Sequence, residues 1–288
     1  ACFRTVLRQP AGDAVMDNTI ALRYGHDAGI TETISGGVDV RMIWGGDEAI
    51  RQIRAAPLAP HAKEPSFADR NSIAALNANA YLSLQGPERK ALAERFYNDT
   101  YWFDQMACSS PRLIVWCGDP DEAEKASHCF FACLQEQIIE KGYSLATGPY
   151  LRKLAFAYGA ILDTSARDYD RYGNELTIVT LTGLGGLGRQ HCGGGFFYQA
   201  FLHTLEELAE FIERRDQTLS AFGFAKEELD CLARRVNGSG IDRIVPIGSA
   251  TLTFQRFWDG YDLLQELTRR VYLGPGDDSA APRNPESA

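Results

Sequence analysis

Short apolar runs alternate along this chain with segments of helical periodicity, and this alternation constrains the fold more than any single motif. Leu113–Cys117 and Leu176–Leu181 are apolar or β-branched runs of strand length. Helical patterns run from Gly86 through Tyr97, from Asp119 to about Lys141, and from Lys226 to Val236. Such alternation is typical of α/β proteins built on a largely parallel sheet, and we predict that fold class.

Turn and capping signals extend this pattern. Val38–Trp44 and Ile241–Val245 are predicted strands, and Gly45-Gly46 joins the first of them to a predicted helix over Asp47–Arg54, with Asp47 as a candidate cap. A capping box at Thr204–Glu207 predicts another helix that runs to about Arg215.

Composition excludes several classes of function. The 288 residues suffice for one large core or two domains, and the formal net charge of −9 argues against a nucleic-acid partner. We find no apolar run long enough to span a membrane. The seven cysteines are odd in number and scattered, which favours reduced thiols in a cytoplasm over a disulfide framework, and they show no zinc-site spacing, so no metal is expected.

Two glycine clusters suggest nucleotide binding to different degrees. Gly183–Gly188 matches G-x-G-x-x-G after a strand, but the residues that follow do not predict the helix that a dinucleotide fingerprint requires. We therefore interpret it as a mobile loop. Gly45-Gly46 lies between a predicted strand and a predicted helix, where main-chain N–H groups can meet an anion.

Cys108 is the candidate nucleophile. It lies in Phe103–Arg112, between the helix that begins at Gly86 and the strand that begins at Leu113. Rigid elements on both sides would hold this cysteine while its sulfur faces a cleft, although a buried structural thiol is the ordinary alternative. Main-chain N–H groups near Cys108 and Ser109 could stabilise an oxyanion.

Several longer motifs occur in one order around this cysteine: Ile43–Asp47, Phe67–Arg70, Phe96–Thr100, Gly240–Gly248 and Trp258–Leu263. Together they resemble the LuxC-type acyl-CoA reductases, the fatty-acid reductases of bacterial bioluminescence and their relatives, within the aldehyde dehydrogenase superfamily. The resemblance covers roughly residues 24–273.

The resemblance implies an aldehyde dehydrogenase-like fold with a catalytic cysteine domain over residues 67–273. Residues 1–66 would be the second half of a nucleotide-binding domain, and residues 274–288 a disordered tail. Cys108 would be the nucleophile, and Gly45, Gly46 and Asp47 the cofactor-phosphate turn. NADPH, or NADH in its place, would reduce an acyl thioester carried by coenzyme A or a protein. An acyl-protein synthetase partner and a homo-oligomer are compatible with this resemblance.

Two departures from the superfamily pattern qualify what the resemblance implies. The stretch Phe67–Ser72 lacks the glutamate that activates water in aldehyde-oxidising relatives, which suits a reductase because hydrolysis would waste the acyl-enzyme. The superfamily's N-terminal part, with its asparagine oxyanion donor, has no counterpart here. We therefore expect a fragment of a longer protein, with a strand near Arg4 on an unpaired sheet edge and poor cofactor binding by the isolated chain.

Three hypotheses remain open from the sequence: an NADPH-dependent acyl-thioester reductase, a cysteine acyltransferase or thioesterase with a histidine base, and a truncated non-catalytic remnant. His191 next to Cys192 could suggest a Cys–His pair, but a structural or loop role is the favoured interpretation. Asp69-Arg70 and Asp242-Arg243 are interpreted as internal ion pairs in preference to substrate contacts. Trp258–Tyr261 has no chemical role that the sequence reveals, and packing is the expected one.

Overall fold

The structure is a computed structural model that describes residues 17–251 and 256–274. It divides into two compact units, Ala1–Ser66 and Phe67–Ala288. The expected strand near Arg4 and the expected tail beyond Gly274 lie outside the described residues. Within the described ranges, no helix has the length and apolar character that crossing a membrane requires.

The first unit contains α3 (Ala28–Gly36), β1 (Ile43–Trp44) and α4 (Asp47–Arg54), and β1 pairs with β2 (Ser66–Phe67) in a two-stranded sheet. The prediction of a strand over Val38–Trp44 was wrong in length, because only Ile43–Trp44 forms regular strand. Val40 makes an isolated parallel bridge to Lys63. Pro65 accepts a hydrogen bond from Ile43 N at 3.1 Å but has no N–H to return, which limits the ladder at this point.

The predicted order of strand, Gly45-Gly46 and helix is confirmed. Gly46 is the N-cap of α4, with φ −66° and ψ 160°, and no side chain caps the helix. The prediction that Asp47 is the cap was wrong, since Asp47 is already the first helical residue. With Glu48 it places carboxylates in the first turn, where they stabilise the helix dipole.

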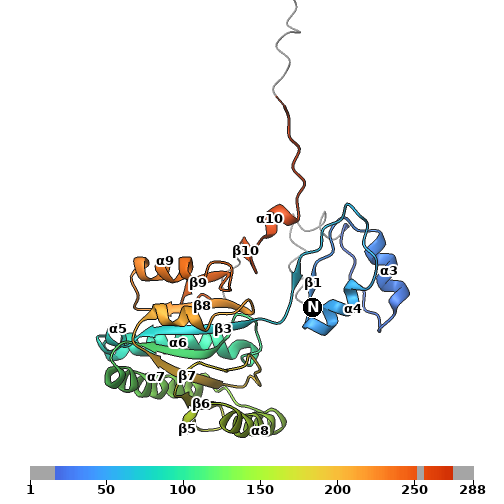
Figure 1. Cartoon of the computed structure of the whole chain (residues 1–288). Helices are drawn as coiled ribbons and strands as arrows, with labels where there is room; N and C mark the ends of the chain where they lie inside the picture. The colour runs from blue at the N-terminus through green and yellow to red at the C-terminus, as the bar shows by residue number, and fades with distance from the viewer. Residues whose placement is uncertain (1–16, 252–255, 275–288) are drawn as a thin grey trace, which may run out of the picture. The chain divides into compact units, whose positions relative to one another are not determined.

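A seven-stranded sheet organises the second unit and confirms the α/β prediction. Its strands run in the order β5 (Ala166–Tyr172), β6 (Leu176–Leu181), β7 (Phe196–Leu202), β4 (Pro111–Cys117), β3 (Asn71–Asn77), β8 (Asp216–Phe222) and β9 (Arg243–Pro246). In Figure 1 the labelled strands of this sheet follow from β9 at the top through β8, β3, β7 and β6 to β5 at the bottom. The β5–β6 pair is antiparallel, and every other pair is parallel.

Two apolar cores cover the two faces of this sheet. All seven residues of β4 are buried, and its successive side chains join different cores: Ile114 and Trp116 one, Leu113 and Val115 the other. The first core packs against α5 (Ala78–Leu82), α6 (Gly86–Thr100) and α7 (Pro120–Glu140). The second packs against α8 (Thr147–Asp163), the 3₁₀ helix η2 (Leu205–Glu210) and α9 (Lys226–Arg235). The sheet is therefore buried on both faces, as parallel sheets require.

The predicted starts of two helices are confirmed, whereas the predicted end of one of them is wrong. Asp119 caps α7 by accepting from Asp121 N at 3.0 Å, and Gly142 follows the helix with φ +66°. The capping box of Thr204 and Glu207 forms, but the predicted helix to Arg215 was wrong. η2 ends at Glu210 because the main chain turns away to Asp216, whose carboxylate accepts from Glu213 N at 2.9 Å. β9 likewise begins at Arg243, two residues later than predicted, after Ile241 adopts φ +57°.

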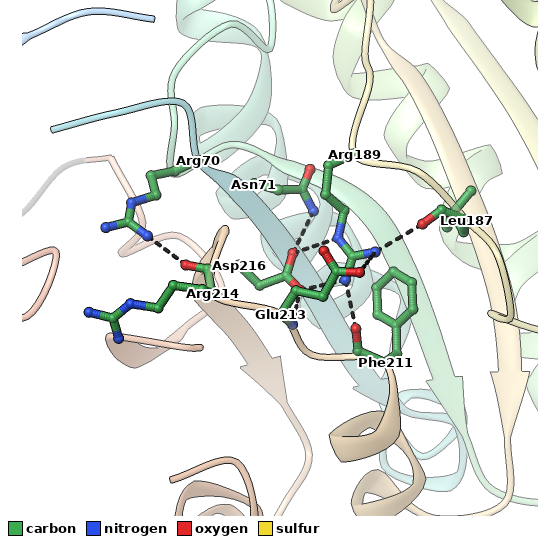
Figure 2. Close-up of polar contacts among 8 residues, drawn as sticks. All are labelled: Arg70, Asn71, Leu187, Arg189, Phe211, Glu213, Arg214 and Asp216. Carbon is green, nitrogen blue, oxygen red and sulfur yellow. Dashed lines mark hydrogen bonds and ion pairs between the residues drawn. The ribbon is translucent and has the colours of Figure 1, made fainter. Parts of the chain in front are cut away.

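A buried ion pair between Arg189 and Asp216 ties several segments together (Figure 2). Arg189 Nε and Nη2 donate to the two carboxylate oxygens at 3.1 and 2.7 Å, and the side chains are 7% and 0% exposed. Asn71 Nδ2 also donates to Asp216, at 3.2 Å. Arg189 donates further to the carbonyls of Leu187 and Phe211 and lies 3.8 Å over the Phe211 ring. The pair therefore joins the starts of β3 and β8 to the glycine-rich loop and to the chain after η2.

We predict that Arg189→Met lowers the free energy of unfolding by about 3–5 kcal/mol, because it leaves the Asp216 carboxylate buried without a cation. Urea denaturation followed by circular dichroism measures this. Lys90→Met is the matched control: Lys90 and Glu136 form a pair whose side chains are 60% and 57% exposed, so this change should leave the stability close to that of the unaltered chain. Equal effects of the two substitutions would contradict the assignment.

Candidate functional site

Polar side chains gather where the parallel strands of the second unit begin. Arg70 directly precedes β3, and Cys108 lies three residues before β4. Gln217 is the second residue of β8, and Arg243 is the first of β9. Parallel strands place their amino ends at one edge of a sheet, so residues far apart in sequence meet there. The register agrees, since Ser72 pairs with both Pro111 and Thr218, and Thr218 pairs with Arg243.

The loop that carries Cys108 is held firmly by a buried glutamine. Asp104 and Gln105 adopt left-handed conformations, with φ +51° and +61°, after the 3₁₀ turn η1 (Tyr101–Phe103). The Gln105 amide nitrogen donates to Pro111 O and Phe196 O at 3.0 and 2.7 Å, and its oxygen accepts from Gly195 N and Phe196 N, both at 3.0 Å. The Ser72 hydroxyl donates to Cys108 O at 2.7 Å. These bonds give the cysteine a fixed main chain, which a nucleophile needs for accurate placement.

Two of the sequence motifs also contact each other beside this loop. Asp99, within Phe96–Thr100, is fully buried and accepts from Gly248 N at 2.6 Å and from Ala250 N at 2.9 Å. Burial raises the pKa of Asp99 to about 6, against the lowering effect of these main-chain hydrogen bonds. Asp99 thus anchors the end of the Gly240–Gly248 motif to α6.

The Cys108 thiol is surrounded by charged and polar groups. Burial raises its pKa above the ordinary value, and the nearby Asp259 carboxylate raises it further. A hydrogen bond from the Gln217 side chain and the charges of Arg243 and Arg112 act in the opposite direction. Because burial has the largest effect, the resting sulfur is a protonated thiol near neutral pH. The two guanidinium groups provide the positive field that a thiolate requires.

Asp259 reaches this site through a tight hairpin. β10 (Phe257–Trp258) pairs antiparallel with β11 (Tyr261–Asp262), and the two turn residues, Asp259 and Gly260, have φ +49° and +78°. Positive φ at both positions indicates a type I′ turn, for which Asp-Gly is a preferred sequence. The Asp259 side chain is 1% exposed and lies 3.6 Å from Arg70 Nε. The Trp258–Tyr261 motif, expected to serve packing, therefore also delivers a buried carboxylate near Cys108.

The two flanking arginines are held mainly by main-chain carbonyls and neutral groups. Arg112 is 7% exposed and donates to Arg70 O at 2.6 Å, and burial lowers its pKa to about 10. Arg243 donates to the Thr218 hydroxyl at 2.9 Å and to Ala250 O at 2.5 Å, and it lies 4.4 Å over the Trp258 ring. Arg70 contacts Asp259 and Arg214 O, and Arg243 contacts Thr218 and Ala250, so both arginines bind segments other than their sequence neighbours.

A cavity of about 300 Å³ adjoins Arg112 and is lined by Asp69, Arg70, Asn71, Arg112, Arg189, Gln190, His191 and Arg215. Burial, with the charge of Arg112 as the second cause, lowers the pKa of His191 to about 4. His191 is therefore neutral at pH 7 and a weak base. The glycine-rich loop Gly183–Gly188 is followed by no helix and forms one wall of a second cavity of about 650 Å³.

Ser109 is 3% exposed and lies beside Cys108, so the structure keeps these two predicted site residues together. Gly45, Gly46 and Asp47 lie in the first unit, at the amino end of α4. Sequence reasoning missed Gln217 and assigned no role to Arg112 or Asp259. The Asp-Gly pair was a usable hairpin signal for Asp259. In the described part of the chain, His, Cys, Asp and Glu side chains form no cluster of three or more that could hold a metal ion.

The model of the family described as acyl-CoA reductase (LuxC) matches residues 10–140, a range that includes Cys108. The chain resembles the LuxC acyl-CoA reductases. It is also 24% identical, over 238 residues, to the long-chain acyl-protein thioester reductase of Aliivibrio fischeri. That alignment covers 78% of this chain and 44% of the relative, so the chain spans less than half of the length of this curated relative.

Solved structures confirm the aldehyde dehydrogenase-like fold. A bifunctional proline utilization A protein superposes with a TM-score of 0.59 at 15% identity, over 80% of this chain and 24% of that protein. The aldehyde dehydrogenase KauB from Pseudomonas aeruginosa superposes with a TM-score of 0.54 at 13% identity, over 78% of this chain and 48% of its own length. At such identities the likeness establishes the fold.

We predict that alkylation of Cys108 by iodoacetamide keeps accelerating as the pH rises beyond the ordinary thiol pKa of about 8.5, because only the thiolate reacts and burial raises its pKa. Arg243→Gln removes a cation from beside the sulfur and should slow the reaction at pH 8 by about tenfold. Mass mapping of the Cys108 peptide measures both effects. Arg256→Gln, at an exposed arginine paired with Asp262, is the control and should change nothing. Faster alkylation of Arg243→Gln would refute the electrostatic assignment.

Proposed function

We propose that this chain carries the catalytic cysteine of an acyl-thioester reductase, which converts an acyl group held on coenzyme A or a carrier protein into an aldehyde. The main support is the position of Cys108. Its loop is held rigidly at the sheet edge where the parallel strands begin, and Gln217, Arg112 and Arg243 converge there. The LuxC family match over the same segment and the acyl-protein thioester reductase relative support acyl reduction.

In this proposal the Cys108 thiolate attacks the thioester carbonyl carbon. A bond forms between Sγ and that carbon, the bond from the carbon to the carrier sulfur breaks, and the carrier leaves as a thiol with the proton that Cys108 gave up. The fixed loop holds the sulfur in position, and the main-chain N–H groups of Cys108 and Ser109 are the proposed donors to the carbonyl oxygen. Arg112 and Arg243 stabilise the thiolate before the attack.

The reduction requires a nicotinamide cofactor, and we propose NADPH. The amino end of α4 fits a cofactor phosphate, because Gly45 and Gly46 have no side chains to cover it and no side chain caps the helix. Gly45, Gly46 and the main-chain amide of Asp47 would hold that phosphate. A bound nicotinamide supplies the hydride that reduces the acyl-enzyme.

The absence of a glutamate from Phe67–Ser72 supports reduction over hydrolysis, since a retained acyl-enzyme must be shielded from activated water. A thioesterase is the second candidate, and from the sequence we expected it to use a histidine as its base. His191, with a pKa of about 4, would accept a proton poorly at neutral pH. An acyl-protein synthetase partner and a homo-oligomer remain part of the proposal through the LuxC resemblance.

We predict that Cys108→Ser abolishes acyl-enzyme formation, because a hydroxyl is a far weaker nucleophile than a thiolate and the change in size is slight. The chain is incubated with isotopically labelled acyl-CoA, and its peptides are mapped by mass. Cys192→Ser is the matched control: this cysteine is also partly buried, its pKa is raised to about 12, and its loss should leave labelling intact. Label on Cys117, Cys129 or Cys192 would overturn the assignment.

The same incubation separates the two candidate activities. Oxidation of NADPH or NADH that depends on acyl-CoA, with aldehyde as product, supports the reductase and identifies the preferred cofactor. Release of free acid without cofactor oxidation would instead establish a thioesterase. Labelled Cys108 with neither product would restrict the activity of this chain to acyl transfer onto the cysteine.

A further inference from the structure

The side-chain amide of Gln217 lies between the nucleophile and a buried carboxylate. Gln217 is 1% exposed, and its amide nitrogen donates to Asp259 Oδ1. Its amide oxygen accepts from the Thr218 hydroxyl at 3.2 Å. Gln217 also lies next to Thr218, which pairs with Ser72, and the Ser72 hydroxyl donates to Cys108 O at 2.7 Å. At this short range the Gln217 side chain lowers the pKa of the Cys108 thiol through a hydrogen bond. The Gln217 amide thus lies among three groups: Cys108 and Thr218 at the sheet edge, and Asp259 in the hairpin turn.

The orientation of this amide follows from hydrogen-bond chemistry. An ionised carboxylate only accepts, so the amide nitrogen and not the amide oxygen must face Asp259. That nitrogen has two N–H bonds. The one that Asp259 does not use remains for the Cys108 sulfur, while the Thr218 hydroxyl holds the oxygen on the other side. Without Asp259, either end of the amide could turn toward the sulfur.

Asp259 is itself fixed in place. The type I′ turn sets its main chain, and Arg70 Nε lies 3.6 Å from its second carboxylate oxygen. Asp242 is also close, and its carboxyl has a pKa raised first by burial, with the Asp259 charge as a further cause. The negative charge of Asp259 by itself opposes thiolate formation at Cys108. The Asp259 carboxylate is therefore better explained as a group that orients the Gln217 amide than as a direct partner of the Cys108 sulfur.

We propose that Gln217 is a catalytic residue that donates an N–H hydrogen bond to the Cys108 thiolate, and that Asp259 is the positioning residue that orients this donor. The chemical benefit rests on the proposed function, because the donor stabilises the nucleophile before it attacks the thioester. Gln217 neither gains nor loses a proton. The proton of Cys108 leaves with the carrier thiol, and the donor moves no electrons.

Alkylation of Cys108 tests this without any acyl donor or cofactor. The full chain reacts with iodoacetamide from pH 6 to 10, and the Cys108 peptide is mapped by mass, with exposed Cys231 as an internal reference. Gln217→Met keeps the length of the side chain but has no N–H. A hydrogen bond to a charged group contributes enough that we expect alkylation at pH 8 to slow by about tenfold or more, with the pH profile displaced upward.

Arg112, Arg243, Asp259 and Asp242 remain in this variant, so the number and sign of the charges around the sulfur are unchanged. Gln217→Leu serves as the second variant if Gln217→Met does not fold, and near-ultraviolet circular dichroism checks the fold of each. An unchanged pH profile in a folded variant would overturn the role of Gln217. That result would not bear on the proposed acylation of Cys108, which is measured separately with acyl-CoA.

The role of Asp259 is tested by comparing Asp259→Asn with Asp259→Ala. Both remove the charge and the ion pair with Arg70, but only asparagine keeps an oxygen that accepts from Gln217. We expect Asp259→Asn to react several-fold faster than Asp259→Ala when Gln217 is present, and the two to react alike when Gln217→Met is added. A difference that persists in the Gln217→Met background would show that Asp259 acts on Cys108 by another route and would overturn the positioning role.

Discussion

The buried pair of Arg189 and Asp216 determines the geometry on which the site depends. Asp216 is fully buried at the first position of β8, and a carboxylate there is tolerated only because a guanidinium and several N–H groups satisfy both oxygens. Through these bonds the pair sets the start of β8 beside the start of β3. Gln217, the next residue, is thereby directed to the edge where Cys108 lies.

Around Cys108 the balance of electrostatic effects favours a thiol at rest. Burial dominates, and the charges of Arg112 and Arg243 only partly offset it. In the proposed reductase, a thiol at rest would be protected until the substrate is bound, since a permanently ionised thiolate would react with oxidants and free thioesters alike. The arginines keep the cost of ionisation moderate. Their hydrogen bonds to carbonyls hold them in place without neutralising them.

The elements that could be predicted are those with strong local signals. The bounds of β6 were predicted to the residue, and α6, α7 and α9 to within one or a few residues, because proline, capping aspartate and apolar periodicity act within a single turn of chain. Predictions were wrong where a distant group intervenes. The helix η2 is shorter than predicted because Glu213 N donates to the Asp216 carboxylate and not to a helical carbonyl. The strand β1 is shorter because Pro65, opposite it, has no N–H to donate.

The sequence by itself determined the α/β class, the helix and strand on either side of Cys108, and the resemblance to the LuxC reductases. All of these follow from residues close together or from motifs in a fixed order. Only the tertiary structure placed Gln217 and Asp259 beside the cysteine. Gln217 lies in a strand that β3 separates from β4, and Asp259 lies 42 residues further along, in a hairpin turn. Parallel pairing brings such positions together irrespective of their distance along the chain, so no local pattern records which side chains will lie beside Cys108.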